Sequence, residues 1–349
     1  MSRGSILMVT SNYRALGGEQ TVINNLCNGL YKIGYNIAIG AYSFDQNPPA
    51  NIEKVNLKKF RSLESNKDTT KYDFDIIHSH QTQMNYYSFL TQKPFIFHYY
   101  GAPNRIQKIN LKVSSFLCRN RISKIIGLSK AALDDLRDIV GESISSKIPS
   151  GIIYCGVDTT YYHLGLSQPY KKGEPQLLFV GNLYPHKNVS AIIKAMPAII
   201  KFYPDAHLQI VGNGSEYQKL ENEVKKEKLE NRVELVGSVS NEELRLRYSS
   251  CDIYVSASKW EMFDLPPIEA MACGKPALLS DIPVHREIFE PSRAGRLFAL
   301  LDEYNIYSAL REVYEKRKLL SSAARQFAEK YDWSMICNEM GKVYENMMA

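Results

Sequence analysis

The chain has 349 residues, of which 44% are hydrophobic and 23% charged, and its formal net charge is +6. This length favours two domains, and the composition is typical of a globular protein and excludes a disordered or fibrous one. No apolar run approaches the roughly 18 residues of a membrane span, so we expect neither a signal peptide nor a spanning helix. The six cysteines show no CxxC or metal-ligand spacing, so we expect reduced, buried thiols in a cytoplasmic protein.

The chain begins with a predicted strand, a glycine loop and a helix. Residues 6–9 predict a buried strand, a polar loop ends in Gly17 and Gly18, and apolar residues then recur at helical spacing until Gly34. Such a loop can present backbone N–H groups to a phosphate, although a glycine pair also makes ordinary tight turns. The spacing is not the GxGxxG of dinucleotide-binding folds, which argues against a dehydrogenase.

Two carboxylates and three histidines raise the question of a metal site. Asp73 and Asp75 form a DxD pattern, but they precede the predicted strand of residues 76–78 and so face away from a ligand edge. His78 and His80 could face one side of this strand, but no carboxylate or thiol accompanies them at a known spacing. We therefore expect no metal. His98 follows the apolar residues 95–97 at a strand's carboxyl end, where open α/β sheets bind ligands; a packed core histidine is the alternative.

The segment from Arg105 to Lys124 combines positive charge with an amphipathic pattern. No acidic residue occurs between Asp75 and Asp134, whereas the basic residues there are Lys93, Arg105, Lys108, Lys112, Arg119, Arg121, Lys124 and Lys130. Its apolar spacing most simply predicts a core-facing helix with a solvated basic face. The alternative is a helix that lies on an anionic bilayer or grips a lipid-diphosphate acceptor. We expect no nucleic-acid partner, because no RNA- or DNA-binding motif accompanies the charge.

Later in the chain, strands and helices alternate after a linker-like stretch at residues 169–175. Strands are predicted at residues 177–180, 208–211, 233–236 and 252–255. This rhythm predicts a parallel sheet. Asn182 and Lys187 follow the first of these strands, at the edge where a ligand would bind.

Residues 261–276 are the most specific pattern in the chain. They read EMFDLPPIEAMACGKP, in which seven residues separate Glu261 from Glu269. The two prolines suit a helix start just after Leu265, and Gly274 ends the helix after about two turns. A helix start carries free N–H groups and positive partial charge, which favour an anion. We place Glu269 in the first turn, where capping of its own helix is the alternative role.

This pattern resembles the signature of retaining nucleotide-sugar glycosyltransferases of family 4, which have the GT-B fold. The resemblance covers nearly the whole chain and is densest from residue 177 to 300. It implies an α/β protein of two Rossmann-like, doubly wound parallel-sheet domains with a donor cleft between them. Residues 1–168 and a returning helix at 333–349 would form the acceptor side, and residues 175–332 would bind the nucleotide sugar.

The resemblance implies transfer of a hexose-type sugar from a UDP- or GDP-sugar to a hydroxyl acceptor with retention, in glycan, glycolipid or polysaccharide synthesis. It assigns the catalytic roles to Glu261, His98 and Lys187. It assigns donor binding to Gly17, Gly18, Asn182, Phe263, Asp264, Leu265 and Glu269. It implies no metal or cofactor, because the lysine and helix dipoles would carry the diphosphate charge.

Two positions depart from the family pattern. Asp264 stands where relatives usually have glycine, and Asn182 stands where they have an arginine that clamps the diphosphate. A nucleotide-sugar-binding protein without transferase activity therefore stays open, as does a synthase with a soluble acceptor. The expected partners are the donor, a sugar, lipid-linked or other hydroxyl acceptor and, through the segment from Arg105 to Lys124, an anionic surface at the inner membrane face.

Overall fold

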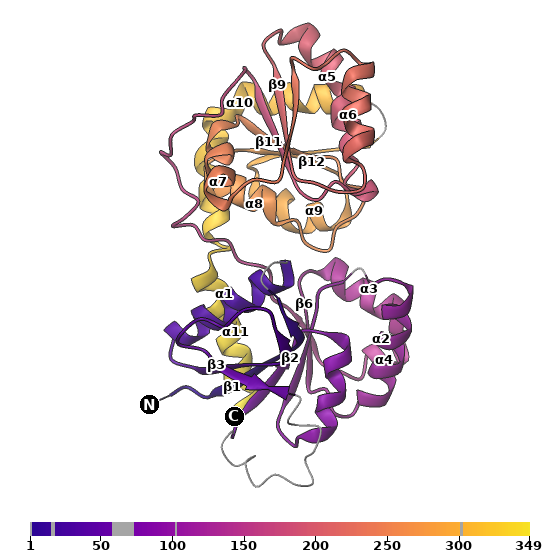
Figure 1. The fold of residues 1–349 in the computed structure, drawn as a ribbon, viewed down its shortest axis with the longest axis vertical. Coiled ribbons are helices and arrows are strands. Elements are labelled where there is room, and N and C mark those ends of the chain that lie inside the picture. Colours follow the sequence, from indigo (N-terminus) through magenta and orange to yellow (C-terminus); the bar gives the residue numbers. More distant parts are fainter. Residues whose placement is uncertain (1, 15–17, 58–72, 102, 301–302) are drawn as a thin grey trace. The chain divides into compact units, whose positions relative to one another are not determined.

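The computed structural model describes residues 2–14, 18–57, 73–101, 103–300 and 303–349. The chain divides into two compact units, which are described separately (Figure 1). Unit 1 comprises Met1–Gly156 and Trp333–Ala349, and unit 2 comprises Val157–Asp332. The sequence-based boundary differs from this division, because residues 157–168 fall in unit 2 together with the linker-like stretch.

Unit 1 contains a parallel sheet of seven strands among the described residues, in the order β3-β2-β1-β4-β5-β6-β7. The strands are β1 (Ser5–Tyr13), β2 (Asn36–Phe44), β3 (Glu53–Asn56), β4 (Ile76–Ser79), β5 (Phe95–Tyr99), β6 (Lys124–Gly127) and β7 (Ser150–Ile152). The central strands are continuous buried apolar runs, as expected for a parallel sheet covered on both faces. The strand order reverses between β1 and β4, which places a ligand-binding edge there.

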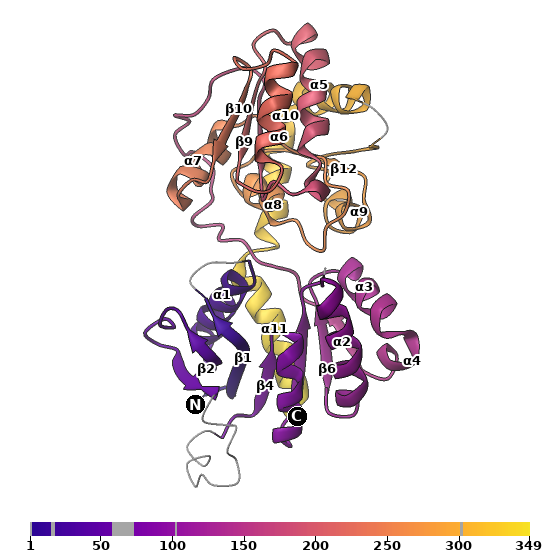
Figure 2. The same ribbon diagram turned by 45° about the vertical axis from the view of Figure 1, so that its right-hand side comes forward.

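Helices cover both faces of this sheet (Figures 1 and 2). They are α1 (Gly18–Lys32), η3 (Thr82–Leu90), α2 (Arg105–Cys118), α3 (Lys130–Val140), α4 (Glu142–Ser145) and α11 (Trp333–Met348). The last helix comes from the end of the chain yet packs against α1 in unit 1. Gly29 allows this close approach, because a Cβ there would lie 2.2 Å from Cys337 Sγ.

The predicted core-facing stripe of α2 is wrong. The five apolar residues of that stripe are 46–72% exposed: Ile106, Ile109, Val113, Phe116 and Leu117. The buried face instead carries Leu111, Ser114, Ser115 and Cys118, and the last three are small side chains that let the helix lie close to its neighbours η3 and α3. Periodicity indicated one apolar face, but the small residues decide which face is covered. Helix α2 therefore presents an apolar stripe to solvent beside its basic residues.

Unit 2 contains a parallel sheet of six strands among the described residues, in the order β10-β9-β8-β11-β12-β13. The strands are β8 (Gln176–Val180), β9 (His207–Val211), β10 (Val233–Gly237), β11 (Ile253–Ser256), β12 (Ala277–Ser280) and β13 (Gly295–Phe298). The strand order reverses between β8 and β11, so a second ligand-binding edge lies where these strands end. The predicted strands and the parallel sheet are confirmed.

Helices again flank the sheet, as Figure 2 shows. They are η4 (Pro185–Lys187), α5 (Val189–Phe202), α6 (Tyr217–Lys226), α7 (Asn241–Ser250), α8 (Leu265–Ala272), α9 (Pro283–Phe289), η5 (Glu290–Ser292) and α10 (Glu303–Glu329). The core of unit 2 forms where Ile192 and Met196 of α5 pack with Leu310 of α10 over the strands. This packing holds the strand ends, and therefore the loops after them, in fixed positions.

Two global expectations can be compared with the structure. Among the described residues, no helix is both long enough and apolar enough to cross a bilayer. All six cysteines are buried, and none forms a disulfide in the described part of the chain, as expected.

Candidate active site

The motif of residues 261–276 lies in unit 2, between the end of β11 and the start of β12. Helix α8 begins at Leu265 with Asp264 as its N-cap, one residue earlier than predicted. Gly274 adopts a left-handed conformation (φ 73°), which confirms that it ends the helix. Glu269 is the fifth helical residue, so its predicted place in the first turn is wrong. Its side chain does not cap the start of α8, so the alternative capping role is also wrong.

Glu269 faces α7 instead. Tyr248, which is fully buried on α7, donates a hydrogen bond of 2.7 Å from its hydroxyl to Glu269 Oε2. Burial raises the pKa of Glu269 to about 7, while hydrogen bonds from Tyr248 and Tyr162 act in the opposite direction. The tyrosines therefore fix the position of the buried Glu269 carboxylate. Further hydrogen bonds donated by a ligand would offset the cost of burying its charge.

Lys187 lies between two carboxylates near the ends of β8 and β11. Its Nζ is 2.5 Å from Glu261 Oε1 and 3.6 Å from Asp264 Oδ1, and all three side chains are largely buried. Ser258 donates a further hydrogen bond of 2.7 Å to Glu261 Oε1. Burial would lower the pKa of Lys187, but Asp264 and Glu261 raise it above its usual value, so the ammonium keeps its charge. Burial and the neighbouring Asp264 raise the pKa of Glu261 to about 7.

Asp264, the residue that departs from the family's glycine, is held by His285 of α9. His285 Nε2 lies 3.1 Å from Asp264 Oδ2, while His285 Nδ1 lies 2.7 Å from the carbonyl oxygen of Ser280. Although burial alone would raise the pKa of Asp264, Lys187 and His285 lower it, so the carboxyl group is ionised. Both partners of the His285 ring, the ionised Asp264 and the carbonyl oxygen of Ser280, are hydrogen-bond acceptors. The cluster thus brings Lys187 and His285 into contact with Glu261 and Asp264.

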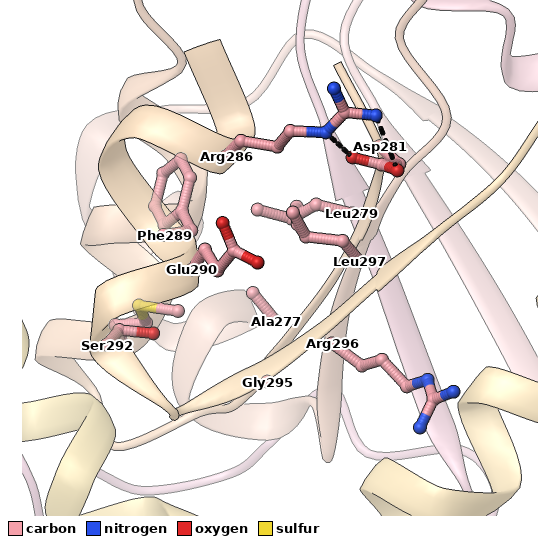
Figure 3. A pocket seen from close by; sticks show the side chains of 11 residues that line it. Ala277, Leu279, Asp281, Arg286, Phe289, Glu290, Ser292, Gly295, Arg296 and Leu297 are labelled. Carbon is pink, nitrogen blue, oxygen red and sulfur yellow. Dashed lines mark hydrogen bonds and ion pairs between the residues drawn. The ribbon is translucent and has the colours of Figure 1, made fainter. Parts of the chain in front are cut away.

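Arg286 and Phe289 of α9 line a separate groove of about 380 Å³, drawn in Figure 3. Arg286 points from α9 toward Asp281, which follows β12, and the two side chains form a bidentate ion pair. In this pair Nε donates to Oδ1, and Nη2 donates a bond of 2.8 Å to Oδ2. This pair anchors the first turn of α9 to the end of β12 and so helps to place the neighbouring His285. The groove lining includes none of the residues that the sequence predicted for the site.

The other residues of unit 2 that the sequence predicted for donor binding lie close in sequence to Lys187, Glu261 and Asp264. Asn182 lies exposed two residues after β8, and it brings no charge to the position where relatives carry arginine. Phe263 packs near Tyr331, with ring centroids 6.5 Å apart. Leu265 is the first residue of α8. Their assignment to donor binding stays a prediction.

Unit 1 gathers the three histidines at the ends of β4 and β5. His78, His80 and His98 are all buried, and one nitrogen from each lies within 4.8 Å of the others. The rings of His78 and His80 stack with centroids 4.4 Å apart, and the rings of His78 and His98 are parallel with centroids 5.3 Å apart and a nitrogen–nitrogen contact of 3.2 Å. Parallel rings direct their nitrogen lone pairs along parallel planes, a poor arrangement for ligands that must converge on one ion. The expectation of no metal stays a prediction.

A pocket of about 450 Å³ opens beside these histidines. His80 and His98 line it together with uncharged hydrogen-bonding side chains, including Ser11, Asn12, Gln20, Gln81, Thr82, Gln83 and Gln107. Glu19, at the start of α1, is the carboxylate of the lining; burial raises its pKa to about 7, and Gln81 donates a bond of 2.8 Å to it. Gly18 also lines this pocket, whereas Gly17 lies outside the described residues.

The sequence did not single out several side chains that hold these sites together. Tyr248, His285, Glu19 and Tyr344 contact site residues but belong to no motif. Only Glu19 could have been noticed from the sequence, because it directly follows the glycine pair. The others are brought in by tertiary packing.

Residues 167–330 match the family model described as "Glycosyl transferases group 1". An uncharacterized glycosyltransferase of Methanocaldococcus jannaschii is 27% identical over 364 residues, covering 98% of each chain. A phosphatidyl-myo-inositol mannosyltransferase of Mycobacterium leprae is 27% identical over 292 residues, which cover 79% of this chain and 74% of that protein.

Two solved structures share the fold over nearly the whole length. Sucrose-phosphate synthase from Thermosynechococcus elongatus superimposes with a TM-score of 0.78 at 20% identity, covering 98% of each chain. HepE of Anabaena in complex with UDP and glucose superimposes with a TM-score of 0.75 at 19% identity, covering 97% of this chain and 99% of that one. The chain is therefore a glycosyltransferase of the GT-B fold, and its residues 167–330 are similar to the group 1 glycosyl transferases.

Proposed function

We propose that this enzyme transfers a hexose-type sugar from a UDP- or GDP-sugar to a hydroxyl group, with retention of the anomeric configuration. The observation that carries the proposal is the ion cluster of unit 2, in which Lys187 lies between Glu261 and Asp264 at the strand ends. A buried ammonium that already has carboxylate partners can exchange them for a diphosphate without losing its compensation. The HepE structures with UDP support a uridine donor as the first to test.

In the proposed donor complex, each side chain of unit 2 has a distinct task. Lys187 binds an oxygen of the diphosphate and stabilises the charge that develops on it as the sugar leaves. Glu261, released from Lys187, accepts hydrogen bonds from the sugar hydroxyl groups and orients the ring. Glu269 accepts hydrogen bonds from the ribose hydroxyl groups. The lysine and backbone dipoles carry the diphosphate charge without a metal ion.

The bond between the sugar C1 and the diphosphate oxygen breaks while a bond from the acceptor oxygen to C1 forms on the same face. The acceptor proton passes to the leaving phosphate oxygen, so charge and atoms balance without a protein base. Two carboxylates that flank one bond, as in glycoside hydrolases, are not required by this route.

We propose that the pocket of unit 1 receives the sugar or other hydroxyl-bearing group of the acceptor. Its amide and hydroxyl side chains match a polyhydroxylated ligand, because each such group both donates and accepts hydrogen bonds, while Arg14 and Glu19 add one charged group of each sign to the lining. His98, which lines this pocket, would contact the reacting sugar.

A thermal-shift screen over nucleotide diphosphate sugars tests the donor assignment. One sugar nucleotide should stabilise the protein by about 2.7 kcal/mol at a concentration 100 times its dissociation constant. The variant Lys187→Met should lose most of this shift, whereas Lys194→Met, which removes an exposed lysine of α5, should keep it. If no UDP- or GDP-sugar stabilises the protein, the donor assignment fails.

The same donor then separates a transferase from a binding protein. Release of the nucleotide that depends on an added acceptor indicates transfer. Tight donor binding without such release, across lipid-linked and soluble acceptors, would favour the nucleotide-sugar-binding alternative that Asn182 and Asp264 left open.

The exposed stripe of α2 supports an anionic membrane surface as a partner. Five exposed apolar side chains lie on one helix with Arg105, Lys108 and Lys112, and the segment after it adds Arg119 and Arg121. Apolar insertion combined with basic residues is the combination that binds a peripheral helix to anionic lipid. A lipid-linked acceptor would suit an enzyme held at such a surface.

A further inference from the structure

Three buried side chains of unit 1 form a hydrogen-bonded chain that leads from helix α11 to the pocket. The Tyr344 hydroxyl lies 2.7 Å from His78 Nδ1, and His78 Nε2 lies 3.2 Å from His98 Nδ1. Each of the three residues is at most 1% exposed. At the far end, His98 Nε2 is buried and has no hydrogen-bonding partner among the residues that the structure describes. Because His98 lines the pocket, this nitrogen is the ring atom available to a ligand.

The hydrogens along this chain can be placed in two ways. Either every group donates toward the pocket, or every group donates toward α11. In the second arrangement Tyr344 accepts from His78, and its own hydroxyl hydrogen needs another acceptor. Among the described residues, His78 is the hydrogen-bond partner of the Tyr344 hydroxyl. Each arrangement leaves one buried hydrogen unpaired within the described residues: the first on His98 Nε2, the second on the Tyr344 hydroxyl. His98 lines the pocket and Tyr344 does not, so only the hydrogen on His98 can gain an acceptor from water or a ligand there, and the first arrangement is preferred.

The surroundings keep all three groups neutral, which this argument requires. Burial, followed by the neighbouring His80 and His98, holds the pKa of His78 well below its usual range. Burial lowers the pKa of His98 to about 3, and it raises the pKa of Tyr344 well above its usual range. Each ring therefore carries one hydrogen, and Tyr344 keeps its own.

The other groups that face these rings leave the chain intact. His80 stacks on His78, but its nitrogens bind elsewhere: Nδ1 lies 2.7 Å from the Tyr100 hydroxyl, and Nε2 lies 3.3 Å from Met8 Sδ. Tyr100 stacks on the face of His98, with ring centroids 4.8 Å apart, but its hydroxyl binds His80 and not His98.

We propose that Tyr344, acting through His78, fixes His98 as the Nε2–H tautomer, so that His98 offers the substrate a hydrogen-bond donor and cannot act as a base at that atom. Tyr344 donates to His78 Nδ1, His78 Nε2–H donates to His98 Nδ1, and His98 Nε2–H points to an oxygen of the reacting sugar. That last acceptor rests on the proposed function; the tautomer does not. Tyr344 and His78 are positioning residues, and α11 acquires a role beyond packing.

The tautomer can be read directly by NMR of the full chain with ¹⁵N-labelled histidine, in which nitrogen shifts distinguish a protonated from an unprotonated ring nitrogen. The variants His78→Gln and His98→Gln assign the signals. In the wild type, His98 should carry its hydrogen on Nε2 at pH 7. In Tyr344→Phe, His98 should become a mixture of the two tautomers, because nothing then fixes the hydrogen of His78.

Tyr35→Phe is the matched control. Tyr35 is also a buried tyrosine packed against α11, and its hydroxyl donates a bond of 3.0 Å to the carbonyl oxygen of Gly341. Its removal should lower stability much as Tyr344→Phe does, but it should leave the tautomer of His98 unchanged. With the donor and acceptor identified, Tyr344→Phe should lower kcat about tenfold with little change in the donor KM, as expected for one lost hydrogen bond at the reacting sugar. Tyr35→Phe should keep the kcat of the wild type.

The outcomes separate this inference from the proposed function. An Nδ1–H tautomer of His98 in the wild type overturns the inference, even if Tyr344→Phe fails to fold. Equal tautomer populations in Tyr344→Phe and the wild type also overturn it. One equivalent of metal that purifies with the protein and is lost in His98→Gln would overturn it as well, since Nδ1 or Nε2 would then be a ligand. A fixed Nε2–H tautomer in a protein that transfers no sugar would instead count against the proposed function alone.

Discussion

The two units have the same architecture, but the polar groups at their strand ends differ in kind. In each unit a parallel sheet reverses its order, between β1 and β4 in one and between β8 and β11 in the other, and the candidate residues follow these strands. Unit 1 places neutral, hydrogen-bonded rings there, whereas unit 2 places a lysine between two carboxylates. The shared fold decides where a ligand binds, and the side chains decide which chemistry it has.

Burial acts on the two sets of groups in different ways. In unit 1, burial lowers the pKa of each histidine and no carboxylate opposes it in the stack, so the rings stay neutral. In unit 2, the carboxylates around Lys187 raise its pKa by more than burial lowers it, so the ammonium stays charged. An amide-rich pocket suits hydroxyl groups, and a buried cation with exchangeable partners suits a diphosphate.

The largest effect should come from Glu261→Ala, which breaks the charged site without touching unit 1. The variant loses the carboxylate that orients the sugar, and it should lower kcat by roughly 10²–10³-fold, the range for removing one preorganised polar group from a transition state. Steady-state kinetics with the identified donor measures this. Glu290→Ala removes an exposed carboxylate just after α9, at the start of η5, and is the control. Unchanged turnover in Glu261→Ala would remove Glu261 from the site.

A smaller effect is expected on stability, through the raised pKa of Glu269. Because its pKa in the folded state is about 7, above the usual value, the folded protein binds this proton more tightly than the unfolded chain. The resulting stability is present at low pH and is lost as the pH rises from about 4.5 to 7. Glu269→Gln, which mimics the protonated form, should therefore stabilise the ligand-free protein by about 1–2 kcal/mol at pH 8 and have little effect at pH 4.5.

Thermal unfolding of both proteins at pH 4.5 and pH 8 measures this difference. Glu230→Gln, at an exposed position just before β10, should show no such pH-dependent gain. The same Glu269→Gln variant should bind the donor more weakly, because it loses an ionised acceptor. A variant that is less stable than the wild type at pH 8 would show that Glu269 is held mainly by favourable bonds to its ionised form.

The smallest effect concerns the surface of unit 1 rather than its pocket. Phe116→Glu places a charge in the exposed stripe of α2 and should reduce binding to phosphatidylglycerol vesicles about tenfold, through lost apolar burial and added repulsion. Leu319→Glu changes a residue of α10 in unit 2 that is 82% exposed, and it should bind vesicles as the wild type does. Sedimentation with vesicles gives both values. Equal losses in the two variants, or no binding by the wild type, would argue against a membrane role for α2.

The sequence predicted the framework of both units because the signals are local. Buried apolar runs give the strands, and Gly274 ends α8 as expected because a left-handed residue there favours glycine. The spacing of Glu261 and Glu269 singled out the loop after β11. These predictions depend on neighbours within a few residues, which a single sequence contains.

The sequence could not predict the partners that arrive from distant positions. Tyr344 reaches His78 across 266 residues, and His285 reaches Asp264 from the next helix. No spacing rule joins such pairs, because the packing of α11 and α9 creates them. The orientation of α2 failed for a related reason: the period of its stripe shows that one face is apolar, but the neighbouring elements determine which face is covered.

The most direct test of the central claim is a crystal structure of the enzyme with its nucleotide diphosphate sugar. We expect the diphosphate within hydrogen-bonding distance of Lys187 Nζ, the ribose hydroxyl groups on Glu269, and Glu261 turned from the lysine toward the sugar. A nucleotide bound away from this cluster, for example in the groove beside Arg286, with the bond between Lys187 and Glu261 intact, would contradict the account.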